Sequence, residues 1–446
     1  MRTRSNPGPR AALSAAVTAA LAVGLFLTGG LGLSPWTGAS NDHARPAASG
    51  PSGGGDPLAA DISTLQDGLR RQPQDPLALA TLGLDYVQQA RNTADPTYYP
   101  KAEEVLQRSL AQQPQDNFAA LGGLAALANG RHDFARALDQ ARRAVAANPY
   151  NSSLYGTLAD ALTQLGRYDE AADAVQRMVD LHPGTPSLAR ASYVAELRGD
   201  TGTARTDMRR ALQDAAGPAD QAFAHYYLAE LAGNSGDPAT ELKEAEAGLA
   251  AAPGYTALLQ AKARAEAAQG DTAAALADLG AATRRVPQPE YVLQLGELYQ
   301  AAGRTREAEQ QYQLFRAEQR LLTDNGVAQD SDAALFEADH GSPEQALAIA
   351  RTGLRTRPFL DSHDALAWAL HRTGQDRAAL AEADQALAQG TRSALFHFHR
   401  AMIQAGLGDT AAERADLGAA LAINPHFHPL HAAEATAALA ALGGQG

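Results

Sequence analysis

Apolar residues recur along most of the chain with the period of an amphipathic helix. The clearest stretch begins near residue 289 and contains the run LGELYQAAGRTREAEQQYQLF. Its first apolar face is formed by residues on one side of a helix: Val292, Leu295, Leu298 and Tyr299. Gly303 is expected to end this helix, and a second apolar face follows: Ala308, Tyr312 and Phe315. Neither helix can bury its apolar face alone, so such a unit needs neighbours on both sides.

Two series of residues repeat in phase with that pattern. Prolines, which block a helix, recur at intervals of roughly 34 residues or about twice that length: Pro73, Pro114, Pro149, Pro183, Pro218, Pro253, Pro287, Pro358 and Pro425. Glycines recur at a similar interval: Gly166, Gly199, Gly236, Gly270, Gly303, Gly341, Gly374 and Gly408. Five positions after most of these glycines lies an alanine, where two helices are expected to cross closely. The exceptions, Glu241 and Glu413, are expected to weaken their units.

The order of Leu-Gly, Tyr, Gly, Ala and a later aromatic residue in the stretch from Leu295 resembles the tetratricopeptide repeat, a helix–turn–helix unit of about 34 residues. This resemblance implies an all-α, right-handed superhelical solenoid. Together with the two series, it predicts about ten helix pairs between Pro76 and Pro425. The pairs are expected to start near residues 76, 118, 152, 185, 222, 256, 289, 327, 360 and 394.

The same register predicts the boundaries of the segments. A helix over residues 57–75 is expected to cover the N-terminal face, and units one to seven are expected over residues 76–322. A turn at residues 323–326 leads to units eight to ten, over residues 327–425, and to a capping helix and tail over residues 426–446. The seventh unit has a long second helix, and a proline is missing after it. We therefore expect the array to bend or loosen near Thr323–Gly326, with a distinct C-terminal segment beyond.

The N-terminus has the pattern of a targeting segment. Arginines among the first ten residues precede an apolar run from Ala11 to Leu33, which is long enough to cross a bilayer as a helix. Residues 1–33 are therefore predicted to be a cleaved signal peptide or a retained transmembrane anchor, and both alternatives stay open. Residues 34–56, rich in Gly, Ser and Pro, are predicted to be a flexible linker. Either alternative places the rest outside the cytoplasm, anchored to the membrane or secreted.

Charge and composition narrow the function. The formal net charge is −13, which argues against a nucleic-acid partner because such proteins usually present a basic face. The chain has no cysteine, which excludes disulfides and thiolate metal sites. It also lacks a phosphate-binding loop, a nucleophile elbow, a zinc-protease motif and a calcium loop. We therefore expect neither an enzyme nor a bound cofactor.

The family resemblance places the binding surface in a concave groove that is lined by set positions of each first helix. In this chain those positions are Tyr193, Glu196, Tyr226, Glu230, Glu290, Glu297, Asp361, Asp364, Trp368, His371 and Arg372. The groove is expected to be acidic with aromatic anchors, although the aromatic residues fit packing between repeats equally well. The main hypothesis is a non-catalytic, extracytoplasmic scaffold that binds a protein or peptide, such as a component of a transporter or envelope complex.

Histidines lead to an alternative hypothesis. Seven of the twelve lie between His363 and His431, and His426 and His428 are close enough in sequence to converge on a metal ion. The chain would then be an accessory protein that handles nickel, zinc or copper. His363, His397 and His431 occupy the same position in successive units, so they are expected to pack between repeats and not to share an ion.

Overall fold

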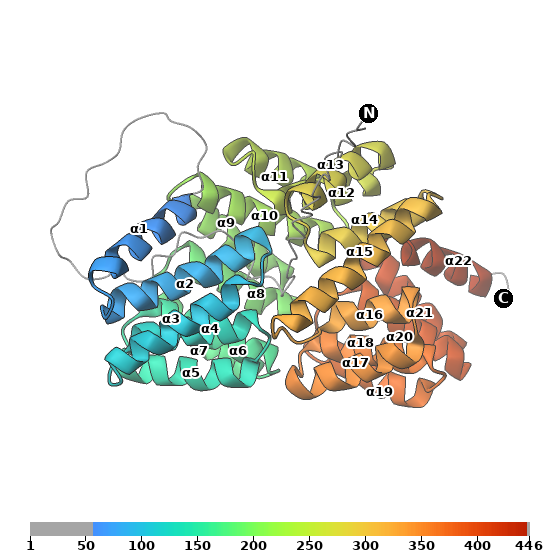
Figure 1. Cartoon of the computed structure of the whole chain (residues 1–446). Helices are drawn as coiled ribbons and strands as arrows, with labels where there is room; N and C mark the ends of the chain where they lie inside the picture. The colour runs from blue at the N-terminus through green and yellow to red at the C-terminus, as the bar shows by residue number, and fades with distance from the viewer. Residues whose placement is uncertain (1–56, 444–446) are drawn as a thin grey trace, which may run out of the picture.

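The computed structural model describes residues 57–443, which contain twenty-two α-helices and no strand (Figure 1). The predicted N-terminal segments, residues 1–33 and 34–56, lie outside this range. Among the helices of residues 57–443, none is long and apolar enough to cross a membrane. The targeting segment therefore stays a prediction.

Twenty of these helices form ten consecutive pairs, which confirms the predicted all-α solenoid. The first helices are α2 Pro76–Thr93, α4 Phe118–Gly130, α6 Ser152–Gln164, α8 Thr185–Leu197, α10 Pro218–Asn234, α12 Thr256–Ala268, α14 Pro289–Ala301, α16 Ser331–His340, α18 Leu360–Arg372 and α20 Ala394–Leu407. The second helices are α3 Tyr98–Gln112, α5 Phe134–Ala147, α7 Tyr168–Leu181, α9 Thr201–Asp214, α11 Pro238–Ala251, α13 Thr272–Arg285, α15 Thr305–Asp324, α17 Pro343–Thr356, α19 Asp376–Leu387 and α21 Thr410–Ile423. The remaining two, α1 Pro57–Arg71 and α22 His431–Gly443, flank the array.

Glycine ends the first helix of most pairs in the left-handed backbone region, which favours a residue without a Cβ atom. Gly166 and Gly303 have φ angles of +66° and +74°. An aspartate often follows such a glycine and caps the second helix, as when the Asp200 carboxylate accepts a hydrogen bond from the Thr203 backbone N–H at 3.0 Å. Gly341 is an exception, because its φ angle is −142°. Local sequence signals therefore place most turns within the pairs.

Glu241 fits into its unit without the alanine that its neighbours have at this position. Its side chain lies where α10 and α11 cross, and only 2% of its surface is exposed. Gly233 leaves the necessary space, because a Cβ atom added there would lie 2.5 Å from Glu241 Oε2. Arg264 Nε donates a hydrogen bond to Glu241 Oε1 at 2.6 Å. A small residue opposite and a charged partner thus accommodate the carboxylate.

The regular backbone packing of the array is interrupted between α15 and α16. These are the only consecutive helices of the described chain whose backbones have little close contact. Aromatic side chains fill the space instead, since the Phe336 ring centroid lies 4.5 Å from that of Phe315 and 5.7 Å from that of Tyr312. The backbone separation lies beside the predicted bend at Thr323–Gly326, but side-chain packing continues across it.

The superhelix closes on itself, so that its C-terminal units lie beside the N-terminal ones (Figure 1). Three hydrogen bonds join the two turns at separations of 193, 192 and 191 residues: from Arg357 to Gln164, from the Leu360 amide to Tyr168, and from Asn424 to the Gly233 carbonyl. The separation is nearly constant. Successive superhelical turns therefore stack in register. The loop within an early helix pair lies against the loop that joins two late pairs.

The C-terminal part of α15 reaches across to the first units. Leu322 and Val327 belong to the apolar cluster of the first unit. The Ala328 backbone N–H donates a hydrogen bond to the Arg131 carbonyl at 3.3 Å. The C-terminal units, which the sequence predicts to be a distinct segment, are therefore packed against earlier units.

Candidate functional site

The residues predicted to line the groove all lie on first helices, but they differ in exposure. Six are buried: Tyr193, Tyr226, Glu230, Glu297, Asp364 and Trp368. Four are partly exposed: Glu196, Glu290, Asp361 and His371. Only Arg372 is exposed. The buried members make contacts inside the chain, so they do not present a continuous acidic and aromatic surface to solvent. Their predicted role in partner binding stays a prediction.

Glu230 is held by an arginine from the next unit. The guanidinium of Arg264 donates hydrogen bonds to the two Glu230 carboxylate oxygens at 2.7 and 3.1 Å, and to Glu241. Burial lowers the pKa of Arg264, but the two carboxylates outweigh it and hold this pKa well above its usual value. The guanidinium is therefore always charged, and it occupies both oxygens of Glu230.

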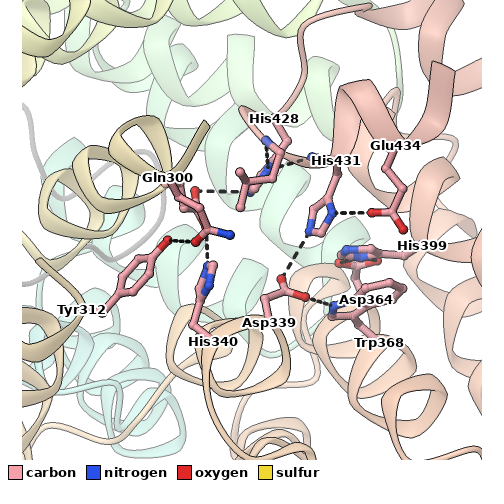
Figure 2. A network of polar contacts seen from close by, with 12 residues as sticks. Gln300, Tyr312, Asp339, His340, Asp364, Trp368, His399, His428, His431 and Glu434 are labelled. Atoms are coloured by element: carbon pink, nitrogen blue, oxygen red, sulfur yellow. Dashed lines mark hydrogen bonds and ion pairs between the residues drawn. The ribbon is translucent and has the colours of Figure 1, made fainter. Parts of the chain in front are cut away.

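A network around Trp368 joins the first helices of the last units (Figure 2). Trp368 Nε1 donates a hydrogen bond to one Asp339 oxygen at 2.8 Å, and the other oxygen lies 3.3 Å from His431 Nε2. The His399 ring stacks on Trp368 with the centroids 4.3 Å apart, and its Nδ1 lies 2.9 Å from Asp364. Asp364 and His399 are each 1% exposed. Their pairing offsets part of the cost of burying each group, although His399 Nε2 has no hydrogen-bond partner among the described residues.

Glu297 connects α14 to α16 and to the loop before α22. Its two carboxylate oxygens lie 3.2 Å from His340 Nε2 and 3.3 Å from His428 Nε2. Because His428 Nδ1 accepts a hydrogen bond from the Leu430 backbone N–H at 3.2 Å, its proton is on Nε2 and is donated to Glu297. Burial raises the pKa of Glu297, but the contacts from His428 and His340 outweigh it and hold the pKa below its usual range.

The structure gives no support to the predicted metal site at His426 and His428. Both ring nitrogens of His428 are engaged within the chain, by Glu297 and by the backbone. His426 is exposed in the turn before α22. Within residues 57–443, no group of three or more His, Cys, Asp or Glu side chains is arranged to hold a metal ion.

Three other histidines brace the two helices of their own pair. Each contact has a length of 2.7 Å and a separation of 19 residues: His225 to Glu244, His363 to Glu382, and His397 to Asp416. His363 and His397 were expected to pack between repeats, but their partners are within the repeat. Sequence reasoning missed this constant spacing of a histidine and an acid, although it is visible in the sequence.

The predicted groove positions lie on the first helices, and we call the surface that they form the inner face. The partly exposed carboxylates of this inner face have raised pKa values. Burial, followed by repulsion from Glu230, raises the pKa of Glu290 to about 7. Burial also raises the pKa of Glu196 to about 7 and that of Asp361 to about 6. Carboxylates in such surroundings change charge near neutral pH and favour a nearby cation.

Comparisons with known proteins bear on the fold. Residues 126–192 match the family model for the tetratricopeptide repeat. Among solved structures, the human IFIT1 dimer with m7Gppp-AAAA is 14% identical with a TM-score of 0.47, covering 74% of this chain and 76% of that chain. A thermophilic tetratricopeptide-repeat protein of Thermus thermophilus is 23% identical with a TM-score of 0.37, covering 44% of this chain and 98% of its own. No match was found among curated proteins.

Proposed function

We propose, from the premise that this chain is a tetratricopeptide-repeat protein, that it is a non-catalytic scaffold that binds a protein or peptide on its inner face. One observation carries the proposal. Buried side chains of the inner face are held by hydrogen bonds to residues of neighbouring units, as Glu230 is by Arg264 and Trp368 is by Asp339. Glu196, Glu290 and Asp361 stay partly exposed among them. A braced surface loses little conformational freedom on binding, so most of the contact energy contributes to affinity.

The proposed binding surface is smaller than the groove that the sequence predicts. It consists of the accessible positions of that groove: Glu196, Glu290, Asp361, His371 and Arg372. The buried positions, such as Trp368 and Asp364, would act indirectly by holding the first helices in place. The surface carries more negative than positive groups, so a partner segment with basic residues would complement it.

Site-specific cross-linking tests this proposal, because the chain has no cysteine of its own. Arg372→Cys places one thiol at the exposed end of α18, on the inner face, and Glu246→Cys places one on the second helix α11. A thiol-reactive photo-cross-linker is attached to each variant. The inner position is expected to yield a defined adduct with a partner protein, and the position on α11 none. Equal adducts from both positions, or none from Arg372→Cys, would refute the binding surface.

We also propose that the scaffold acts outside the cytoplasm. The support is the basic start and the apolar run Ala11–Leu33. In intact cells, protease added from outside is expected to digest the full-length chain once any outer barrier is opened. A chain that lacks residues 1–33 is expected to stay protected. Protection of both chains would contradict the proposed location.

A further inference from the structure

A small cavity lies where α15 and α16 separate and the chain crosses to the first units. Its wall includes His132 from the turn between α4 and α5, Leu322 from α15, and Asp330 and Asp332 at the start of α16. The space accommodates a group about the size of one water molecule. The cavity thus combines residues from three separate parts of the chain.

Asp330 and Asp332 line the cavity, and two further carboxylates, Glu290 and Asp361, act electrostatically on Asp332. We call these four residues the axial acid cluster: Glu290, Asp330, Asp332 and Asp361. They come from α14, the start of α16, and α18, and the other three all act electrostatically on Asp332. Arg357 is the cation that acts on Asp332, and it lies 3.9 Å from Asp361. Within residues 57–443, the other three carboxylates form no ion pair with a lysine or arginine. The cluster therefore has more carboxyl groups than cations that could pair with them.

His132 is a second, independent sign of a ligand. Its side chain is 4% exposed, and neither ring nitrogen has a hydrogen-bond partner among the described residues. The Ala328 backbone lies beside the ring and raises the pKa of His132, but burial has the larger, opposite effect. Burial, together with nearby Arg357, lowers the pKa of His132 to about 3, so the ring is neutral and has a lone pair to accept a proton donor. A buried polar group without a partner is costly unless something else satisfies it.

We propose that the axial acid cluster and His132 form a binding site for an ammonium group. An ammonium group is close to water in size and has three donors, which suit two aspartates and a neutral imidazole. A planar guanidinium is larger than the space, and the described residues hold no arrangement suited to a metal ion. The ammonium group can belong to a lysine of a partner peptide or to a free amine. The peptide source rests on the proposed scaffold function, whereas the site itself does not.

Binding is expected to release protons. Burial and repulsion raise the pKa of Asp330 and of Asp332, that of Glu290 to about 7 and that of Asp361 to about 6. A bound cation favours the ionised carboxylates, so protons leave as the ligand enters. The titratable and charged groups that act on the cluster from the surrounding elements are His132, Tyr168, Tyr193, Tyr226, Glu230, Arg264, Tyr291, Arg357 and Asp364. Among them, Arg264 has a pKa that, despite burial, is held well above its usual value by Glu230 and Glu241, so it stays charged at neutral pH.

Calorimetry with the full-length chain tests the site. The probes are n-butylamine, the peptide acetyl-Gly-Lys-Gly-amide, and acetyl-Gly-norleucine-Gly-amide as the neutral control. Both amines are expected to bind, with the heat depending on the ionisation enthalpy of the buffer at about pH 6.5, and the norleucine peptide is not. Binding of n-butylamine alone would support the site but oppose a peptide source. If neither amine binds, the site is refuted, while the cross-linking experiment still decides the scaffold function.

Variants that remove one charge without changing shape locate the binding. Asp332→Asn and, separately, Glu290→Gln are each expected to weaken amine binding roughly tenfold or more. Asp332→Asn is also expected to raise the Tm of the free protein, since it removes repulsion from the other three carboxylates. Glu246→Gln on α11 removes an exposed carboxylate and is expected to change neither quantity. Unchanged binding in both cluster variants, or equal weakening by Glu246→Gln, would overturn the proposal.

Discussion

Among single residues, Glu318 on α15 shows how much the closed superhelix buries. Its side chain is 0% exposed, and neither carboxylate oxygen has a hydrogen-bond partner within the described chain. Burial raises its pKa to about 9. It lies one helical turn before Leu322, which packs onto the first unit. The acid is therefore neutral at pH 7 and contributes no ion pair to the closure.

Glu318→Gln is expected to make the protein less sensitive to rising pH. The folded-state pKa is above the unfolded-state value, so the folded chain keeps a proton that the unfolded chain loses. The free energy of unfolding of the wild type should therefore fall as the pH rises from about 4.5 to about 9. At pH 7 the loss amounts to about 3 kcal/mol. Urea unfolding at about pH 5 and pH 8 measures this, and a difference between variant and wild type that does not change with pH would contradict it.

Trp368 and Asp364 show that a residue predicted to line the groove can be buried. The family register places them on the inner face, and the structure places them on α18 as expected. Their partners, Asp339 and His399, lie on neighbouring first helices, 29 and 35 residues away. A groove position is therefore not an exposed position, because a tightly wound superhelix brings inner faces together.

At the scale of elements, α15 is the helix that departs most from the repeat. Its 20 residues exceed those of every other described second helix. The additional turns carry Leu322 to the apolar cluster of the first unit, and they leave α16 without close backbone contact to α15. Phe336 on α16 bridges the separation through the rings of Tyr312 and Phe315.

Phe336→Ala is expected to destabilise the contact between the seventh and eighth units by about 3–5 kcal/mol, because little backbone contact remains to limit the cavity. Amide hydrogen exchange should increase in α16 and α17 before it increases in α4 and α5. Tyr150→Ala serves as the control, since that ring is 79% exposed and its loss should stay within about 0.5 kcal/mol. Equal exchange in all four helices would show that Phe336 does not bridge a local separation.

For the whole molecule, closure changes how the repeats share stability. In an open array each repeat contacts only its neighbours, so stability is nearly a sum over adjacent units. Here hydrogen bonds at separations of 193, 192 and 191 residues connect early units to late ones. The ends of the array therefore cannot unfold independently while these contacts hold.

Two glycine substitutions separate closure from local strain. Gly166 and Gly303 have similar positive φ angles of +66° and +74°. A Cβ atom at Gly166 would lie 2.4 Å from the Pro358 carbonyl oxygen, whereas none of the described atoms lies within 4 Å of one at Gly303. Gly303→Ala is expected to cost about 1 kcal/mol through backbone strain. Gly166→Ala should cost more and force the two turns apart.

Small-angle X-ray scattering and chemical unfolding measure this pair. The radius of gyration is expected to increase for Gly166→Ala and to stay unchanged for Gly303→Ala. The unfolding transition of Gly166→Ala should also become less cooperative, since early and late units are no longer linked. The same dimensions and transition for both variants would mean that the closure contributes little to stability.

The sequence alone determined the features that depend on contacts within a repeat or between neighbours. The apolar stripes, the glycine turns and the aspartate caps predicted ten helix pairs, of which only α10 and α16 begin away from the expected residue. These signals are readable because a helix, its caps and its turn involve residues close together in the chain. The 19-residue spacing of histidine and acid belongs to the same class.

The tertiary structure alone decided which inner positions are buried and where carboxyl groups without a cationic partner collect. Tyr168 meets Leu360 across 192 residues, and no local pattern encodes that meeting. Asp332 faces Glu290, Asp361 and the His132 cavity only because α15 crosses to the first units and the superhelix closes. The pitch of a superhelix sums small rotations at many interfaces between units, so a pattern read one repeat at a time cannot determine it.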